Sequence, residues 1–306
     1  MNNDSITIDI CGLKLRSPTA LASGILGYSA KSLNLVADSG AGAVVTKSIG
    51  VNPREGYLNP SVFQAACGII NAMGLPNPGI DEYCKEIFLT KKTLSVPLIV
   101  SVYGYNADEY AILAKKATDA GADAIELNVS CPHVQYTGSE IGTDPKLLSD
   151  VVNKTRNAIK KPLIVKLSSN VTDIAEIAQV AVKAGADALT IINTVRAIAI
   201  DVETQRPILA NKRGGLSGSA IKPIALRCVF DIYEKLPNTP IFGCGGVSNW
   251  RDAVEFFLAG ACAVQVGTAI VTEDAVFKDI NQGVKAYLKS KQYRSLKEIV
   301  GLSHKN

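Results

Sequence analysis

One cysteine in this sequence stands where a buried strand opens into a loop, a place where reactive groups are common. The segment ELNVSCPH (126–133) places Asn128 before the thiol of Cys131 and His133 after it. A free thiol has a pKa of about 8.5, so Cys131 could act as a base near neutral pH or as a nucleophile. Taken alone, a cysteine is more often buried core filling. Its position between Asn128 and Pro132 at a strand end favours a functional role.

Other reactions can be weighed from the same residues. A cysteine and a histidine two apart suggest a thiol-protease pair, but such close neighbours in a loop rarely form one, and no third member is visible. Lys166 could be the Schiff-base lysine of an aldolase. The asparagines expected beside it are better suited to a planar heterocycle, because an amide offers both donors and an acceptor.

The composition is that of an ordinary globular protein and narrows the functional classes. The chain has 306 residues, 47% of them apolar, and a net charge of only +4. This mild charge, with few aromatic residues among the lysines, argues against nucleic acid binding. The seven cysteines include no C-x-x-C pair. Their pattern argues against a disulfide framework or a metal site and predicts a reducing compartment, the cytoplasm.

The sequence shows no sign of a membrane or targeting segment. The opening, MNNDSITIDICG, has no apolar stretch of the kind that signal peptides need. The longest uncharged stretch, from Gly56 to Ile80, contains three prolines and several glycines and asparagines. This content makes a membrane helix unfavourable. We interpret the stretch as a long loop and expect no membrane contact.

A near-repeat predicts the architecture. AKKATDAGADAIELN (114–128) resembles AQVAVKAGADALTIIN (178–193), and each has a helical apolar pattern, a glycine and a short apolar strand. The glycine suits the left-handed position that ends a helix. Strands that are apolar on both faces are typical of a covered parallel sheet.

The repeat extends to eight strands separated by helical patterns. The strands are expected near residues 19, 44, 98, 124, 163, 188, 241 and 263. Eight alternating units without a linker predict an α/β protein with one (β/α)8 TIM barrel, a single domain over 1–306. Within it we expect an N-terminal hairpin over 1–16 that turns at Cys11-Gly12 and closes the bottom of the barrel. The barrel itself would span 17–290, and a tail would span 291–306.

Small residues, polar residues and glycines follow these strands at the end where barrel enzymes carry their chemistry. They are Ala22, Ser23, Gly24, Lys47, Ser48, Asn128, Lys166, Asn193, Thr194, Gly245, Gly246, Gly267 and Thr268. Two lysines, two asparagines and a thiol thus converge on one mouth. A core has no use for such groups, because burying unpaired polar atoms is costly. We therefore predict a binding site at this mouth.

Glycines after the last two strands indicate a phosphate site, where backbone N–H groups face an anion. GGLSG (214–218) could add a third wall of bare backbone. A nicotinamide-binding fold is disfavoured, since Gly40-Ala41-Gly42 precedes its strand and Gly243-Cys244-Gly245 lacks a third glycine at the right spacing. The other cysteines, Cys244 and Cys262 among them, are interpreted as packing residues.

A set of short motifs runs along nearly the whole chain. They are ASG after the first strand, TKS after the second, NAMGLPNPG (71–79), ELNVSCP (126–132), VKLSSNVTDI (165–174), INT (192–194), RPILANKRGGLSGSAIKP (206–223), GCGGV (243–247) and VGTA (266–269). Together these motifs resemble those of the dihydroorotate dehydrogenase family. The resemblance implies an FMN-dependent TIM barrel that oxidises dihydroorotate to orotate in pyrimidine biosynthesis. The cysteine at 131 and the lack of an N-terminal helical extension resemble the class 1 enzymes. IDVETQRPILANKRGGLSG (200–218) is most similar to the class 1B catalytic subunit.

The resemblance also implies partners. A class 1B catalytic subunit pairs with an FAD and iron–sulfur subunit that passes electrons to NAD⁺. We therefore expect a homodimer or a heterotetramer with that subunit. Fumarate or a quinone stays open as the final acceptor.

Roles follow by resemblance for individual residues. Cys131 would remove a proton from C5 of dihydroorotate while hydride leaves C6 for N5 of the flavin. Substrate would be bound by Lys47, Asn71, Met73, Gly74, Leu75, Asn128, Asn193 and Thr194. FMN would be bound by Ala22, Ser23, Gly24, Lys47, Ser48, Asn128, Lys166, Ile192, Ser217, Gly218, Gly245, Gly246, Gly267 and Thr268.

One residue departs from the family pattern. Where the family usually has an asparagine after Cys-Pro, this chain has His133. The motif SCPH also occurs in dihydropyrimidine dehydrogenase, which reduces uracil and thymine. A flavin subunit of that kind, and a non-catalytic barrel that binds a phosphate ligand, are the alternative functions.

Overall fold

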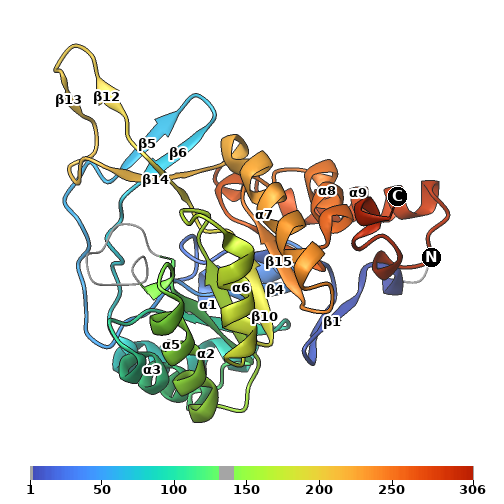
Figure 1. Ribbon diagram of the computed structural model, residues 1–306, viewed down its shortest axis with the longest axis horizontal. Helices are drawn as coiled ribbons and strands as arrows, with labels where there is room; N and C mark the ends of the chain where they lie inside the picture. The colour runs from blue at the N-terminus through green and yellow to red at the C-terminus, as the bar shows by residue number, and fades with distance from the viewer. Residues whose placement is uncertain (1–2, 131–140, 306) are drawn as a thin grey trace.

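The protein's computed structural model describes residues 3–130 and 141–305, so Cys131 and His133 lie outside the described residues. Eight parallel strands close into a barrel in the order β10-β15-β16-β3-β4-β7-β8-β9. Figure 1 shows the whole chain, with β4, β10 and β15 of this barrel labelled. They are β3 (Thr19–Leu21), β4 (Ala43–Val45), β7 (Leu98–Val102), β8 (Ala124–Asn128), β9 (Leu163–Leu167), β10 (Ala188–Ile191), β15 (Ile241–Cys244) and β16 (Ala263–Val266). The predicted barrel and its eight strands are confirmed.

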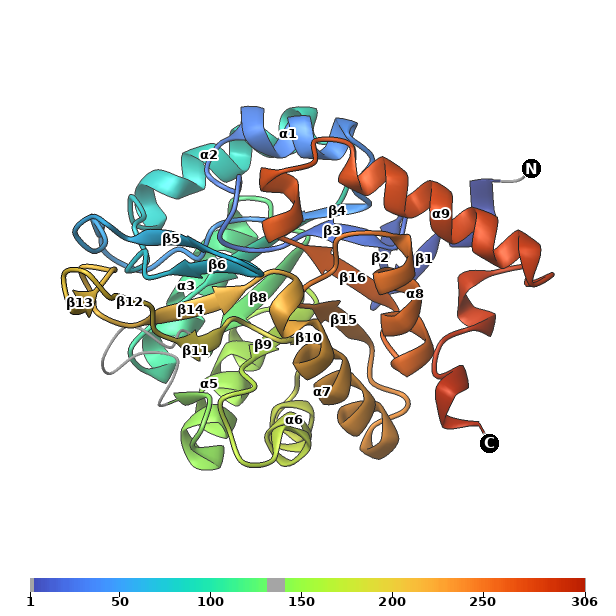
Figure 2. The same ribbon diagram turned by 90° about the horizontal axis from the view of Figure 1, so that it is seen from above.

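Helices surround this barrel, as Figure 2 shows. They are α1 (Ala30–Asp38), α2 (Ile80–Thr93), α3 (Ala107–Asp119), α5 (Pro145–Ala158), α6 (Ile174–Lys183), α7 (Lys222–Lys235), α8 (Trp250–Ala259) and α9 (Val276–Ser290). Side chains of Asn106, Asp144, Asp173 and Asn249 accept from the first backbone N–H groups of α3, α5, α6 and α8. These caps fix where each helix begins. The repeat glycines Gly121 and Gly185 follow α3 and α6 with φ of 117° and 113°, as predicted.

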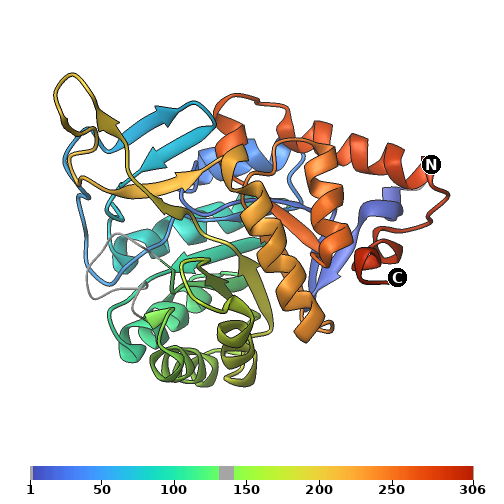
Figure 3. The same ribbon diagram turned by 45° about the horizontal axis from the view of Figure 1, so that its top comes forward.

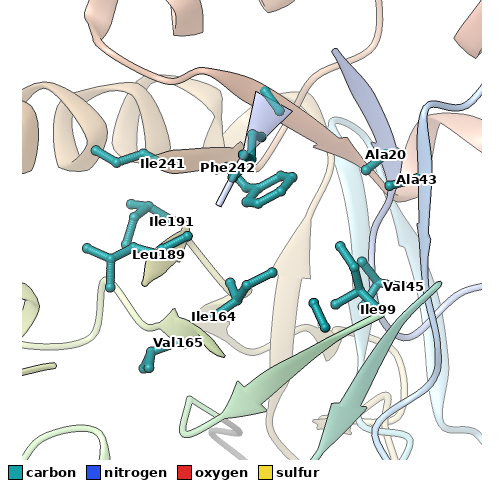
Figure 4. Packing of buried hydrophobic residues seen from close by; sticks show 14 of the residues in the cluster. Ala20, Ala43, Val45, Ile99, Ile164, Val165, Leu189, Ile191, Ile241 and Phe242 are labelled. Atoms are coloured by element: carbon teal, nitrogen blue, oxygen red, sulfur yellow. The ribbon is translucent and has the colours of Figure 1, made fainter. Parts of the chain in front are cut away.

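The barrel interior is apolar towards the amino ends of the strands and polar towards their carboxyl ends. Residues two apart on a strand face the same side, so Ile164 and Phe242 share the interior with Lys166 and Cys244 and lie one layer nearer the amino ends of the strands. Figure 4 shows this packing of buried side chains, including Ile164 and Phe242, both fully buried. The apolar layers hold the barrel together, and the polar layer above them forms the site.

The predicted N-terminal hairpin is present. Strands β1 (Ile8–Ile10) and β2 (Leu13–Leu15) pair around Cys11 and Gly12, whose φ values are 53° and 85°. Cys11 Sγ donates to the backbone oxygen of Asp187 over 3.2 Å, just before β10 begins. The hairpin therefore packs at the amino end of the barrel, opposite the mouth. The 3-10 helices η4 (Leu296–Glu298) and η5 (Leu302–His304) follow α9.

A second, antiparallel sheet lies beyond the carboxyl ends of the barrel strands (Figure 3). Its order is β11 (Val195–Ala197), β14 (Gly214–Ser217), β6 (Gly68–Asn71) and β5 (Val62–Ala65), and the small pair β12 (Ile200–Asp201) and β13 (Arg206–Pro207) extends from it. The predicted long loop is therefore wrong over residues 62–71. These strands have only four residues each, and β6 pairs with β14, which lies far along the chain, so the local pattern carried no strand signal.

No helix among the described residues is both long and apolar enough to cross a membrane.

Candidate active site

A pocket of about 800 Å³ opens at the carboxyl ends of the barrel strands, beneath the second sheet. Its volume is in the range of small-molecule and cofactor sites. Every predicted site residue lines it except Cys131, which lies outside the described residues. The predicted residues in its wall are Ala22, Ser23, Gly24, Lys47, Ser48, Asn71, Met73, Gly74, Leu75, Asn128, Lys166, Ile192, Asn193, Thr194, Ser217, Gly218, Gly245, Gly246, Gly267 and Thr268.

Amide side chains on one side of the pocket are held by hydrogen bonds to each other and to serines. Asn128, at the end of β8, donates to Ser48 Oγ over 2.9 Å. Asn193, after β10, donates to Ser130 Oγ over 2.9 Å, and Ser130 in turn donates to Asn128 Oδ1 over 3.1 Å. These contacts fix which way each amide points before a ligand arrives.

The first lysine of the pocket, Lys47, follows β4 and is 4% exposed. Its Nζ lies 4.9 Å from the ring centroid of Tyr28, a distance that suits a cation–π contact. No carboxylate of the described residues forms an ion pair with it. A nearly buried ammonium without an anion is suited to bind an anionic ligand.

The second lysine, Lys166 on β9, is also 4% exposed, and its Nζ donates to Gln265 Oε1 over 3.3 Å. Burial by itself lowers the pKa of Lys166, but the neighbouring Cys244 and the carboxylate of Glu126 raise it, and the net pKa lies above the ordinary value. Lys166 therefore brings a positive charge to the pocket at neutral pH.

A tight loop between β6 and α2 contributes Met73, Gly74 and Leu75. Gly74 and Leu75 both have positive φ, 73° and 56°. The loop is held by Arg54 Nε, which donates to the Gly74 oxygen over 2.5 Å, and by Asn77 Nδ2, which donates to the Leu75 oxygen over 2.9 Å. The fixed backbone can present its N–H groups to a carboxylate.

The glycine loops meet at the opposite side of the pocket. Gly218 and Gly246 have φ of 97° and 76°, and a Cβ added at Gly246 would lie 2.9 Å from the Gly218 oxygen. Thr268 Oγ1 and Ser217 Oγ lie 2.9 Å apart. The backbone N–H groups of Gly246 and Gly267 have no acceptor in the part of the chain that the structure describes. Such bare N–H groups suit the oxygen atoms of a phosphate.

The structure adds residues that the sequence interpretation missed or misplaced. Cys244, interpreted as packing, lines the pocket, and burial raises the pKa of its thiol although Lys166 lowers it. Cys262 precedes β16, and its Sγ donates to the Ile241 oxygen over 3.3 Å. Gln265 also lines the pocket, and Glu126 lies below it with no exposed surface. Both are polar residues inside apolar strands, a signal that could have revealed them.

The sequence profile described as "Dihydroorotate dehydrogenase" matches residues 5–288 of this chain. The chain belongs to the dihydroorotate dehydrogenase family. The predicted family and the predicted class of oxidoreductase are thereby confirmed.

Individual relatives give the subclass. The chain is 48% identical over 300 residues to a protein of Methanocella arvoryzae, covering 98% of both chains. It is 48% identical over 302 residues to one of Pyrococcus furiosus, covering 98% of this chain and 99% of the relative. Both relatives are named "Dihydroorotate dehydrogenase B (NAD(+)), catalytic subunit". The predicted likeness to the class 1B catalytic subunit is confirmed.

A solved structure supports the fold independently. The family's enzyme from Eimeria tenella, crystallised with ferulenol, superposes with a TM-score of 0.85 over 99% of this chain and 89% of that one. Its sequence identity is 23%, so this likeness shows the barrel fold alone.

Proposed function

We propose that this chain is the catalytic subunit of an NAD-linked dihydroorotate dehydrogenase, which oxidises (S)-dihydroorotate to orotate for pyrimidine biosynthesis. The observation that carries this proposal is that two buried lysines, a set of oriented amides and the glycine loops at Gly218, Gly246 and Gly267 line one pocket. These glycine loops are called the glycine cradle below. The names of the relatives support the same substrate and the same acceptor.

The pocket residues fit FMN. The backbone N–H groups of Gly246 and Gly267, which have no acceptor among the described residues, would hold its phosphate together with Thr268 and Ser217. Lys166 would lie at the pyrimidine edge of its ring. When bound, FMN supplies a hydride acceptor at N5 and gathers negative charge towards N1 and O2, which a lysine stabilises.

The amides and the first lysine fit dihydroorotate. Its ring alternates N–H and C=O groups, which Asn71, Asn128 and Asn193 would match with paired donors and acceptors. Lys47 and the backbone of Gly74 and Leu75 would receive its carboxylate. Lys47 lies near the amides and has no competing anion among the described residues, so charge and shape agree.

We assign the base to Cys131, which lies outside the described residues. The support is chemical and local: Ser130, its neighbour, is buried and bonded to the amide of Asn193. A thiolate at 131 would remove the proton from C5 while hydride leaves C6. The role of the base therefore predicts a rate that rises with pH.

The partners follow from the same proposal. Electrons would leave through an FAD and iron–sulfur subunit to NAD⁺, and the chain would form a homodimer or a heterotetramer with that subunit. The cytoplasmic location and the domain boundaries at residues 16 and 290 stay predictions.

The test begins with colour. The purified protein should be yellow, and anaerobic dihydroorotate should bleach it, with one orotate formed for each flavin reduced. Dihydrouracil is the matched control and should leave the colour unchanged. Bleaching by dihydrouracil instead would favour the dihydropyrimidine alternative, and a colourless protein that cannot bind FMN would favour the non-catalytic barrel.

A further inference from the structure

A buried carboxylate lies beneath the floor of the pocket, where the proposed reaction gives it no role. Glu126 on β8 has no exposed surface and does not line the pocket. Its Oε1 has no hydrogen-bond partner among the described residues. A carboxylate in such surroundings is costly to bury, so its presence in an otherwise apolar strand calls for a reason.

A single side chain connects this carboxylate to the second lysine of the pocket. Gln265 on β16 donates through Nε2 to Glu126 Oε2 over 2.8 Å and accepts through Oε1 from Lys166 Nζ over 3.3 Å. Thr190 also donates to Glu126 Oε2, over 2.9 Å. All of these groups are nearly or fully buried.

The chemistry of the two ends fixes how the amide of Gln265 is turned. A carboxylate only accepts, so it must face the NH₂ group; an ammonium only donates, so it must face the oxygen. Both ends demand the same orientation. The row Lys166–Gln265–Glu126 therefore carries a positive charge at the pocket and a negative charge beneath it.

We propose that Glu126, acting through Gln265, is a positioning residue that keeps the Lys166 ammonium charged and directed into the pocket. This inference rests on the proposed function, because it assigns the charge to the pyrimidine edge of FMN. The groups that face Lys166 from neighbouring strands are Cys244 on β15 and Glu126 on β8. Cys244 raises the pKa of Lys166 only as a thiolate, a form that burial disfavours. Glu126 is the other group that raises this pKa, and it is the one that Gln265 joins to Lys166 by hydrogen bonds.

The consequence is a fixed proton count when the flavin is reduced. Two electrons and one proton convert the oxidised ring to its reduced anion, provided that the cation beside it is charged in both states. A lysine that is neutral beforehand would take up a second proton as the anion forms. The number of protons taken up for two electrons therefore reports the charge of Lys166.

The test is the midpoint potential of the bound flavin measured from about pH 6 to about pH 9.5, a range that spans ordinary His, Cys and α-amino titrations. In the wild type the midpoint potential should change with pH as expected for the uptake of one proton with two electrons, over the whole pH range. In Glu126→Gln the amide oxygen can still accept from Gln265 and Thr190, so chiefly the charge is lost. In that variant the number of protons taken up with two electrons should rise from one to two as the pH increases within this range, because Lys166 becomes neutral in the oxidised protein.

Two matched variants separate charge from packing. Glu126→Asp keeps the charge and should restore the one-proton slope, while Thr190→Val disturbs the same layer without touching the charge and should resemble the wild type. If Glu126→Gln does not fold, Gln265→Asn carries the test, because its shorter side chain cannot reach both Lys166 and Glu126, and it should also gain the second proton.

Three results bear on the inference. A wild type that takes up two protons, or a Glu126→Gln variant that follows the wild type at every pH, overturns it. A Glu126→Asp variant that takes up one proton at every pH, as the wild type should, supports the inference. A wild type that binds no FMN refutes the proposed function instead, so the two failures are distinguishable.

Discussion

Asn128 and Ser48 are joined by a 2.9 Å hydrogen bond in which the amide of β8 donates to the hydroxyl that follows β4. The contact leaves Asn128 Oδ1 to accept from Ser130, so the amide is held from both sides. An amide held in this way loses little freedom when a ligand binds, which is why preorganised polar groups contribute strongly to catalysis.

Asn128→Ala should lower kcat/KM for dihydroorotate by roughly 100-fold. The change removes ring contacts of about 1 kcal/mol each and takes one hydrogen-bond partner from Ser48 and one from Ser130. Stopped-flow bleaching of the flavin by substrate measures the effect. Asn157→Ala is the control and should match the wild type, because Asn157 is exposed on α5 and its amide donates to Asn153 on the same helix. Equal losses in both variants would contradict the assigned role.

Lys47→Ala should raise the KM for dihydroorotate by about 10- to 100-fold, the equivalent of losing one charged hydrogen bond to a carboxylate. FMN content should change little, since the glycine cradle is intact. Steady-state kinetics and the flavin absorbance ratio measure the two quantities. Lys31→Ala, an exposed lysine on α1, serves as control. A neutral analogue without the carboxylate should no longer distinguish the wild type from the Lys47→Ala variant, and a persistent difference would argue against the carboxylate contact.

Cys131→Ala should lower the rate of flavin reduction by about 10²- to 10⁴-fold, the usual contribution of a positioned base. In the wild type the rate should rise with pH until the thiolate has formed, near the ordinary thiol pKa of about 8.5. Cys84→Ala, on the half-buried face of α2, is the control. A wild-type rate that is flat between about pH 6 and 9 would remove Cys131 from this role.

The barrel could be predicted from sequence because each strand is a short apolar run with its own local signal. Ala124–Asn128 and Ala188–Ile191 follow the same helix–glycine pattern, and both belong to the barrel. The second sheet could not be predicted in this way. Its β6 pairs Asn71 with Gly215, and neither the sequence of β14, GGLS, nor that of β5, VFQA, alternates apolar and polar residue types. Pairing between segments so distant depends on the barrel that brings them together.

The candidate site was predictable to the extent that its residues follow strand ends. Lys47, Asn128 and Lys166 all line the pocket as expected. Gln265 and Glu126 could not be predicted in the same way, because each interrupts an apolar strand and precedes another apolar residue, so neither stands at the strand end that indicates a site. Cys244 was assigned to packing because a cysteine in a strand usually packs. Cys244 lines the pocket because its side chain points from β15 into the barrel interior, and the sequence alone does not show which way that side chain points.

Gly246→Ala should abolish FMN binding and destabilise the fold. The residue has a φ of 76°, and the new methyl group would lie 2.7 Å from Lys222 Cβ and 2.9 Å from the Gly218 oxygen. The cradle would have to open to admit it. Gly12→Ala is the matched control: φ is 85°, but nothing lies within 4 Å of its Cβ. It should cost about 1 kcal/mol of stability and leave FMN content unchanged. If Gly246→Ala retains FMN, the loops around residue 246 can move enough to accept the methyl group, and the prediction is wrong.

Asp252 should make the protein sensitive to acid, because it ties the loop before α8 to α7. Its carboxylate accepts from Lys222 Nζ over 2.8 Å and from the backbone N–H and hydroxyl of Ser248 over 3.0 and 2.8 Å. Burial by itself raises the pKa of Asp252, but these hydrogen bonds lower it, and the net pKa lies below the ordinary value. A carboxyl whose pKa is lowered by folding stabilises the fold fully above its unfolded pKa of about 3.9. That contribution is lost as the pH falls through the folded pKa.

Asp252→Asn should therefore cost roughly 1–3 kcal/mol at pH 7, the range for a lost charged hydrogen bond. The difference from the wild type should shrink as the pH falls below about 4, where the wild-type carboxyl is itself protonated. Urea unfolding at several pH values measures both. Asp231→Asn breaks an exposed pair with Arg227, four residues earlier on α7, and should cost no more than about 0.5 kcal/mol at any pH. A cost for Asp252→Asn that is independent of pH would mean that packing, and not the charge, holds this loop in place.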